Sequence, residues 1–360
     1  MTAQVEIARI AHPNPVSDAE RAVMMTDPVF GSVRTDHMVT IRYSEQDGWH
    51  DAKLEPRGPL PLDPASAVFH YAQEIFEGMK AYRREDGRVV LFRPEQNAQR
   101  FQASARRLAM PELPADLFVD AVKALVKADE AWVPSEGSLY LRPFLIATEG
   151  ALGVRPSNEY MFVVIACPVG NYFKGEARAV SIWASTEYSR ASRGGTGFAK
   201  CGGNYAASLL AQAEAYKNGC EQVLFLDAVE GKWIEELGGM NVFFVKKDGS
   251  LITPPLGGTI LPGVTRNSLI QLAKDRGHTV NEEMYSLEQL RSDCQSGEVV
   301  EAFACGTAAI VVGIGRIKTP SGDFQIGDAN EGDFSQSIRA ELLSIQKGLS
   351  EDRHNWVQPV

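Results

Sequence analysis

Strand patterns and helix patterns mix along this chain without strict alternation, and this order restricts the fold more than any other feature. Apolar, strand-like runs such as QVLFLD, KWIEE and NVFFVKK follow one another with only short turns between them. The pair Asp248-Gly249 marks one of these turns. A doubly wound parallel sheet would instead need a helix after nearly every strand. The sequence therefore predicts a mixed α+β fold.

Apolar residues at helical spacing predict several helices between these strands. The strongest pattern is ADLFVDAVKALVKADE at 115–130, which carries one apolar stripe. Further helices are predicted at 95–110, 206–219, 265–277, 286–293 (with Ser286 and Gln289 as a capping box) and 335–348. Strands are predicted at 38–43, 88–94, 137–147, 160–168, 181–185, 222–227, 232–236, 241–247, 250–255, 298–304 and 309–317.

The length of 360 residues predicts two domains, because one domain typically takes about 100–200 residues. The segment PVGNYFKGEA at 168–177 is rich in Pro, Gly and Asn and lies near the middle of the chain, as a linker would. We therefore expect a loose arm over 1–29, a small domain over 30–168, an interdomain loop over 169–180 and a large domain over 181–360.

Composition excludes several classes of protein. The net charge of −10 argues against a main task of binding nucleic acid. No signal peptide is evident, and no apolar run approaches the ~20 residues that cross a bilayer. The 5 cysteines and 6 histidines are dispersed without metal-ligand spacing. We expect a cytoplasmic protein with no metal site and no membrane or nucleic-acid partner.

The segment GGTGFAKCGGNY places Lys200 inside a run of glycines, which allow the backbone to approach a ligand closely. A lone lysine in such a loop is typical of a solvated surface. A phosphate-binding loop is excluded because Ala199 precedes the lysine and Cys201 follows it. A dinucleotide fingerprint is also absent. A third interpretation is a lysine that forms a Schiff base with pyridoxal phosphate.

A pyridoxal phosphate site needs more than a lysine. A carboxylate must keep the pyridine nitrogen protonated, and the phosphate needs an arginine and amides at a helix start. The sequence contains candidates for each group. Taken singly, each candidate is typical of an ordinary surface, helix or turn residue.

A series of segments, in order, resembles the branched-chain amino acid aminotransferases of the fold type IV group of pyridoxal phosphate enzymes. One such segment alone would be weak, but their common order and spacing are specific. They are FGSVRTDHMV (30–39), IFEGMKAY (75–82), LFRPEQNAQRF (91–101), SLYLRPFLI (138–146), GALGV (150–154), GFAKCGGNYAASL (197–209), EELGGMNVFF (235–244), TPPLGGTILPGVTRNSL (253–269) and EAFACGTAAIV (301–311).

The resemblance implies a small open α/β sandwich lobe and a larger pseudo-barrel lobe that carries the cofactor lysine. It implies a ping-pong transaminase that moves the amino group between L-leucine, L-isoleucine or L-valine and 2-oxoglutarate, in the biosynthesis or breakdown of these amino acids. Lys200 would bind the cofactor aldehyde and carry protons. The other implied cofactor contacts are Arg100 and Thr307 at the phosphate, Val264 and Thr265 at a helix start, Tyr205 at the phenolic oxygen and Glu236 at the ring nitrogen.

The resemblance also implies a substrate pocket and a homodimer. Tyr140 and Arg142 would meet the side-chain carboxylate of glutamate, and Ala308 and Thr307 would lie by the substrate's α-carboxylate. The loop with Leu152 and Val154 would reach the partner subunit's site. Aromatic residues would line the pocket for the aliphatic side chain, unless they only fill the core: Phe30, Tyr71, Phe76 and Tyr140.

Two positions depart from the family pattern. Gly239 stands where a threonine is often found, and Ala309 and Val312 stand where some members have a redox-active cysteine pair. Two other functions stay open at this point. One is a D-amino acid aminotransferase or an aminodeoxychorismate lyase of the same fold. The other is a non-catalytic protein that binds phosphorylated metabolites, which would not need Lys200.

Overall fold

The computed structural model describes residues 5–170 and 179–360, and these form two compact units. The first unit holds residues 5–170, 199–202 and 344–360, and the second holds 179–198 and 203–343. The predicted linker at 168–177 and the predicted loop at 169–180 lie largely outside the described residues. Each unit is built around its own sheet with helices packed on it, as the mixed α+β prediction requires.

Among the described strands of the first unit, β1 and β3 pair in parallel and all the other pairs are antiparallel. Its long central pair, β7 and β8, runs in register from Ser138 opposite Val169 to Ala147 opposite Tyr160. In spatial order the strands are β1 (Ala8–Arg9), β3 (Gly48–Pro56), β2 (His37–Ser44), β8 (Glu159–Val169), β7 (Ser138–Ala147), β5 (Met79–Arg83), β6 (Val89–Phe92) and β18 (Val357–Pro359), with β4 (Glu74–Phe76) also pairing with β7.

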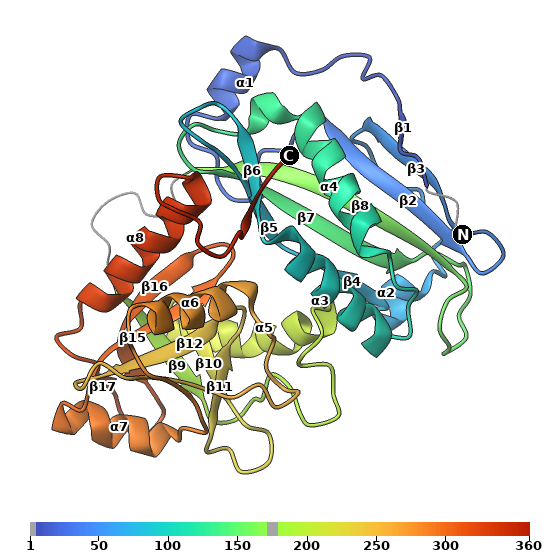
Figure 1. Cartoon of the computed structure of the whole chain (residues 1–360). Helices are drawn as coiled ribbons and strands as arrows, with labels where there is room; N and C mark the ends of the chain where they lie inside the picture. The colour runs from blue at the N-terminus through green and yellow to red at the C-terminus, as the bar shows by residue number, and fades with distance from the viewer. Residues whose placement is uncertain (1–4, 171–178) are drawn as a thin grey trace. The chain divides into compact units, whose positions relative to one another are not determined.

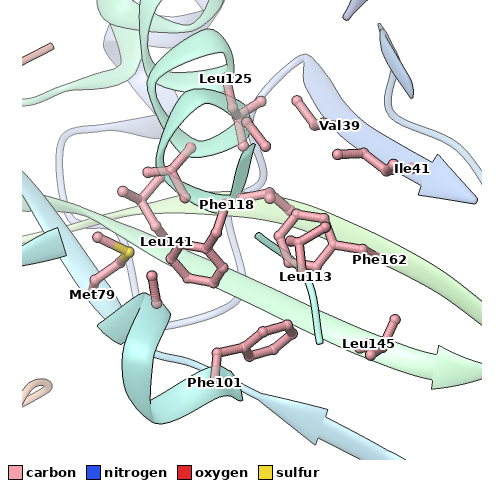
Figure 2. Close-up of a cluster of buried hydrophobic side chains, with 14 of the residues drawn as sticks. Val39, Ile41, Met79, Phe101, Leu113, Phe118, Leu125, Leu141, Leu145 and Phe162 are labelled. Atoms are coloured by element: carbon pink, nitrogen blue, oxygen red, sulfur yellow. The ribbon is translucent and has the colours of Figure 1, made fainter. Parts of the chain in front are cut away.

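Helices α3 (Pro94–Arg107) and α4 (Ala115–Ala128) pack against this sheet (Figure 1). Both have the apolar stripe that the sequence predicts, and Pro114 precedes the first residue of α4. Phe101, Phe118 and Phe162 meet at the centre of the core, with ring centroids 5.3–5.7 Å apart (Figure 2). The short helices of this unit are α1 (Asp18–Met24), α2 (Ala67–Tyr71) and a 3-10 turn (Glu130–Trp132).

The expectation of a loose N-terminal arm is wrong for part of that segment. Residues 8–9 form β1 against β3, and α1 begins after Ser17. The Ser17 hydroxyl accepts the Glu20 N–H, and the Glu20 carboxylate accepts the Ser17 N–H, which is a complete capping box. This Ser-x-x-Glu signal was present in the sequence and indicates a helix start.

The sheet of the second unit mixes parallel and antiparallel pairs. β9 pairs in parallel with both β10 and β16, whereas β12, β15 and β16 form an antiparallel run. In spatial order the strands are β11 (Ile234–Leu237), β10 (Gln222–Leu226), β9 (Val180–Ser185), β16 (Ile310–Lys318), β15 (Val299–Gly306), β12 (Asn241–Lys246), β13 (Leu251–Thr253) and β14 (Val280–Glu282), with β17 (Phe324–Gln325) beside β16.

This second sheet curls on itself. β11 is the first strand of the order, and β12 lies far along it, yet a tight turn joins the two. In that turn the Leu237 N–H donates to the Met240 carbonyl over 2.9 Å. The strands between them must therefore follow a curve, as in the predicted pseudo-barrel.

Helices α6 (Val264–Asp275) and α7 (Leu287–Ser296) pack on the second sheet, both in contact with β15. Leu290 of α7 joins a core with Val242, Phe244 and Ala302. Phe243 and Phe303 lie on the same two strands but alternate with these core residues, so they point to the other face of the sheet. There their rings stack with centroids 5.0 Å apart. Two further helices are α5 (Gly202–Lys217) and α8 (Asp333–Lys347).

The division into units differs from the predicted domains in two segments. Residues 199–202 and 344–360 belong to the first unit, although 181–360 was expected to form one domain. The C-terminal segment joins the first unit because β18 pairs with β6, and Trp356 packs edge-on against Phe92. The exact domain boundaries stay a prediction. Within the described ranges, none of the helices has the length and apolar character needed to cross a membrane.

Helix α3 ends in a motif that usually contains glycine. The Met110 N–H donates to the Ala105 carbonyl, and the Ala109 N–H donates to the Arg106 carbonyl. This is the Schellman pattern, whose central residue adopts a left-handed conformation. That residue is Ala109, with φ of 52° and an exposed position. A side chain is disfavoured there because its Cβ crowds the following carbonyl.

We predict that Ala109→Gly stabilises the protein by about 1 kcal/mol, because glycine adopts this conformation without the Cβ penalty. Ala103→Gly, inside the same helix, is the matched control and should destabilise by roughly 0.5–1 kcal/mol. Thermal unfolding followed by calorimetry measures both changes. Destabilisation by both substitutions would contradict the assigned helix end.

Candidate functional site

Lys200 lies in a short extended segment that runs beside β4 of the first unit. The Phe76 N–H donates to the Lys200 carbonyl over 2.9 Å, and the Lys200 N–H donates to the Ser104 hydroxyl over 2.9 Å. The flanking Ala199 and Cys201 are buried in the core of the unit. The Cα of Lys200 is thus held in place by these two backbone hydrogen bonds and by the two buried neighbours.

The Phe76 ring lies near two cationic groups. The Lys200 amine is 4.8 Å from the ring centroid, and the Arg142 guanidinium carbon is 4.6 Å from it. Arg142 also donates to the Tyr140 hydroxyl over 3.0 Å. Gly78 permits this arrangement, because a Cβ there would lie only 2.3 Å from the Tyr140 oxygen. The predicted substrate residue Phe76 therefore lies beside the predicted catalytic lysine, and Arg142 contacts both Phe76 and Tyr140.

Phe30 completes this cluster. Its ring packs edge-on against Tyr140 with centroids 4.9 Å apart. Phe30, Tyr140 and Arg142 line a cavity of about 140 Å³ in the first unit. The remaining residues of its wall are Gly31, Arg34, Arg57, Ile165, Ala166 and Cys167. The cavity thus combines aromatic and aliphatic walls with guanidinium groups.

Arg100 is buried on α3 rather than solvated. Its Nε donates to Glu77 Oε1 over 2.7 Å, and its Nη2 donates to Glu77 Oε2 over 2.8 Å. Asn97 donates to the same carboxylate over 2.8 Å. Burial would raise the pKa of Glu77, but Arg100, its hydrogen bonds and the charge of Lys200 outweigh burial and hold that pKa below its ordinary value. Glu77 therefore orients Arg100 as a fixed cation.

Tyr71 lies apart from the other predicted substrate residues. Its hydroxyl donates to the Leu152 carbonyl, and with Val154 it lines a second cavity of about 340 Å³. Leu152 and Val154 are 63% and 86% exposed. The structure thus groups Tyr71 with the loop expected to reach the partner subunit.

The second unit contains the predicted acid, Glu236, on β11. It is buried and accepts hydrogen bonds from the Leu261 N–H over 2.9 Å and from Asn241 over 3.2 Å. Arg190 forms an ion pair with it at 2.9 Å. Burial raises the pKa of its neighbour Glu235, and a hydrogen bond with Thr259 and the charge of Arg190 offset only part of that effect.

The glycine-rich loop before Lys200 packs tightly within the second unit. Arg190 donates to the Thr259 carbonyl over 2.9 Å and to the Gly197 carbonyl over 3.2 Å. A Cβ on Gly197 would lie 2.2 Å from the Thr259 oxygen. Glycine is therefore required at this position by close packing.

The start of α6 fits a phosphate group. Val264 and Thr265 are its first residues, and the preceding Gly263 provides no side-chain cap. A Cβ on Gly263 would lie 2.1 Å from the Asn241 oxygen, so only glycine fits this approach. Uncapped amides at a helix start bind anions well. The residues present thus suit the phosphate of a pyridoxal cofactor.

Other predicted residues of the second unit lie on α5 and in a turn. Tyr205 is on α5, and a Cβ on Gly239 would lie 3.8 Å from its ring, so the position that departs from the family pattern borders Tyr205. Thr307 and Ala308 form the turn between β15 and β16. No cluster of potential metal ligands occurs within 5–170 and 179–360.

Comparisons with known proteins give the same family as these residues. The family model described as amino-transferase class IV matches residues 74–317. A probable branched-chain-amino-acid aminotransferase of Streptomyces coelicolor is 55% identical over 99% of this chain and 98% of its own. The chain belongs to the branched-chain amino acid aminotransferase family. A branched-chain-amino-acid aminotransferase of Mycolicibacterium smegmatis is 52% identical, with 98% of each chain covered.

Solved structures of this family share the fold. The branched-chain amino acid aminotransferase of Escherichia coli matches with a TM-score of 0.74 at 28% identity, over 90% of this chain and 98% of that one. The enzyme of Thermobaculum terrenum, solved in its pyridoxal phosphate form, matches with a TM-score of 0.73 at 26% identity, over 89% and 97%. The predictions of a fold type IV aminotransferase and of a pyridoxal phosphate cofactor are confirmed.

Several residues of the site were missed by sequence reasoning. Glu77 lies inside the quoted segment IFEGMKAY, yet nothing in that segment indicates its pairing with Arg100. Arg190 lies outside every quoted segment, and Asn241 was quoted without a role. Arg34 and Arg57 were also not singled out. A search for charged residues within otherwise apolar segments would have selected Glu77, together with Lys80, but not Arg34, Arg57 or Arg190.

We predict that Glu77→Ala destabilises the protein by about 3–5 kcal/mol, because it leaves the buried Arg100 without its carboxylate. Glu112→Ala, which removes an exposed partner of Arg106, is the matched control and should cost about 0–1 kcal/mol. Because the pKa of Glu77 is lowered on folding, its contribution is present above the ordinary carboxyl value of 4.5 and is lost as the pH falls further. Urea unfolding between pH 7 and pH 3 measures the difference, and equal losses for both variants would contradict the assignment.

Proposed function

We propose that this protein is a transaminase that moves the amino group between L-leucine, L-isoleucine or L-valine and 2-oxoglutarate in a ping-pong cycle. The products are the branched-chain 2-oxo acids and L-glutamate. The relatives named above support this choice over a D-amino acid aminotransferase or an aminodeoxychorismate lyase.

One observation carries this proposal. The Lys200 amine and the Arg142 guanidinium lie near one aromatic ring, and Arg142 borders a cavity with both apolar and cationic walls. A transaminase of this kind must accept an aliphatic side chain in one half of its cycle and a carboxylate in the other. Apolar walls favour the first, and a guanidinium favours the second.

We propose roles for residues of the first unit. When bound, pyridoxal phosphate supplies an aldehyde for the substrate amine and a ring that delocalises the electron pair left on Cα. The Lys200 amine would take the proton from the substrate Cα and hold it until it is returned. Arg100, oriented by Glu77, contributes a positive charge for the phosphate, and Phe76 limits how far the Lys200 amine moves.

In the second unit, Glu236 would hold the ring nitrogen protonated, and its contacts with Arg190, Asn241 and the Leu261 N–H keep its carboxylate in one orientation. Tyr205 would donate to the phenolic oxygen. Phosphate contacts are proposed for Val264, Thr265 and Thr307, with Ala308 beside the substrate carboxylate.

We also propose a cytoplasmic homodimer. The loop with Leu152 and Val154 exposes apolar side chains, and Tyr71 is hydrogen-bonded to it. Apolar side chains exposed on one loop are typical of a surface that another chain covers. Tyr71, Leu152 and Val154 would then act together in the partner subunit's site.

Lys200→Ala should abolish turnover and the visible absorption of the lysine-bound cofactor, since no other amine would replace the missing one. Lys232→Ala, which removes an exposed lysine that packs on Trp233, is the control and should leave both unchanged. Absorbance spectra and half-reactions with L-leucine, L-glutamate and D-alanine test this. Wild-type absorption in Lys200→Ala would refute the catalytic lysine, and bleaching of the wild type by D-alanine but not L-leucine would favour the D-amino acid enzyme.

A mixing experiment tests the shared site. Lys200→Ala and Val154→Asp chains should each be nearly inactive, the second because a charge enters an apolar contact. A mixed dimer would contain one site of two with both an intact lysine and an intact loop. Random pairing after mild denaturation gives mixed dimers in half of all cases. Remixing should therefore restore about a quarter of the wild-type activity. Light scattering checks the dimer, and no recovery from mixed dimers would contradict the shared site.

A further inference from the structure

We propose that Arg34 and Arg57 select the dicarboxylic substrates of this enzyme by binding, together with Arg142, the side-chain carboxylate of glutamate and 2-oxoglutarate. This inference rests on the proposed function. It adds two specificity-determining residues that act on one of the two substrate classes.

The three arginines share one cavity near the catalytic lysine. Arg34, Arg57 and Arg142 line the same cavity of about 140 Å³ in the first unit. Arg142 connects this cavity to the Lys200 amine, because both groups lie near the Phe76 ring. A substrate whose α-amino group is near Lys200 can thus direct a side chain of glutamate length along Phe76 toward these guanidinium groups.

The positive charges of these arginines are not neutralised by ion pairs with the residues that the structure describes. Within the described part of the chain, no acidic side chain forms an ion pair with Arg34, Arg57 or Arg142, whereas the buried Arg100 and Arg190 each have a glutamate partner. Burial and the positive charge of Arg34 both lower the pKa of Arg57. Two guanidinium groups near each other without an acid repel, and an anion between them would remove that cost.

Arg142 has unused hydrogen-bonding capacity. Its Nε is buried and has no hydrogen-bond partner among residues 5–170 and 179–360. A buried donor without a partner is costly, so such groups usually indicate a missing ligand or water. A carboxylate can accept from Nε and Nη of one arginine and from a second arginine at the same time.

Arg34 and Arg57 both keep contact with solvent. Arg34 is exposed and Arg57 is half-buried, so water can solvate both when no carboxylate is bound. The walls formed by Phe30, Ile165 and Ala166 remain available to an aliphatic side chain. Substitution of Arg34 or Arg57 should therefore affect glutamate far more than leucine.

The experiment compares half-reactions of the purified holoenzyme with L-glutamate and with L-leucine, followed by the change in cofactor absorbance. Arg57→Gln should raise the KM for glutamate about tenfold and Arg34→Gln about threefold, while the KM for leucine changes less than about twofold and the maximal rates stay within about twofold. Arg57→Lys should recover part of the loss. Arg353→Gln removes one exposed positive charge elsewhere and should change neither KM.

Salt provides a second measurement. Increasing sodium chloride should raise the KM for glutamate in the wild type more steeply than in the Arg34→Gln, Arg57→Gln double variant, because fewer charges remain to be screened. Equal changes in both KM values, or no change in either, would overturn the role of these arginines. Failure of the wild type to react with leucine would instead overturn the proposed function, since that reaction does not depend on Arg34 or Arg57.

Discussion

The backbone attachment of Lys200 to Phe76 and Ser104 is the contact on which the candidate site depends. A lysine side chain is long and flexible, so its amine is placed well only if the backbone that carries it is fixed. Here the N–H and the carbonyl of Lys200 are both engaged, and buried neighbours on each side anchor the segment. The glycines around it permit the close approach. A Cβ on Gly202, for example, would lie only 2.3 Å from Glu74 Oε1.

Sequence patterns predicted most of the longer elements whose own residues define a buried face, but not β3 or β5. Helix α4 and strands β7 and β8 agree closely with prediction because their periodicity reflects burial along the whole element. Strands β1 and β18, of two and three residues, were not predicted, because their only support is a neighbouring strand. The assignment of 199–202 to the first unit was missed for the same reason.

The site shows the same limit. The resemblance selected Lys200, Arg100 and Glu236 because they lie in recognisable segments. It did not select Glu77 or Arg190, whose importance comes from partners distant in sequence. The charge of a residue can be read from the sequence, whereas its neutralisation depends on packing. For this reason sequence analysis named the groups expected to touch the cofactor more readily than the groups that hold them in place.

The arginines of the candidate site are of two kinds, which differ in whether a glutamate neutralises their charge. Arg100 and Arg190 are buried, and each has a glutamate partner that offsets the cost of burial and leaves little freedom to respond to a substrate. Among the described residues, Arg34 and Arg57 have no glutamate partner of this kind, and both keep contact with water. An enzyme that binds leucine and glutamate in one cavity needs cations of the second kind. A fully buried, unpaired arginine would make the leucine complex costly, whereas a hydrated one loses little with leucine and still gains a charge-assisted hydrogen bond with glutamate.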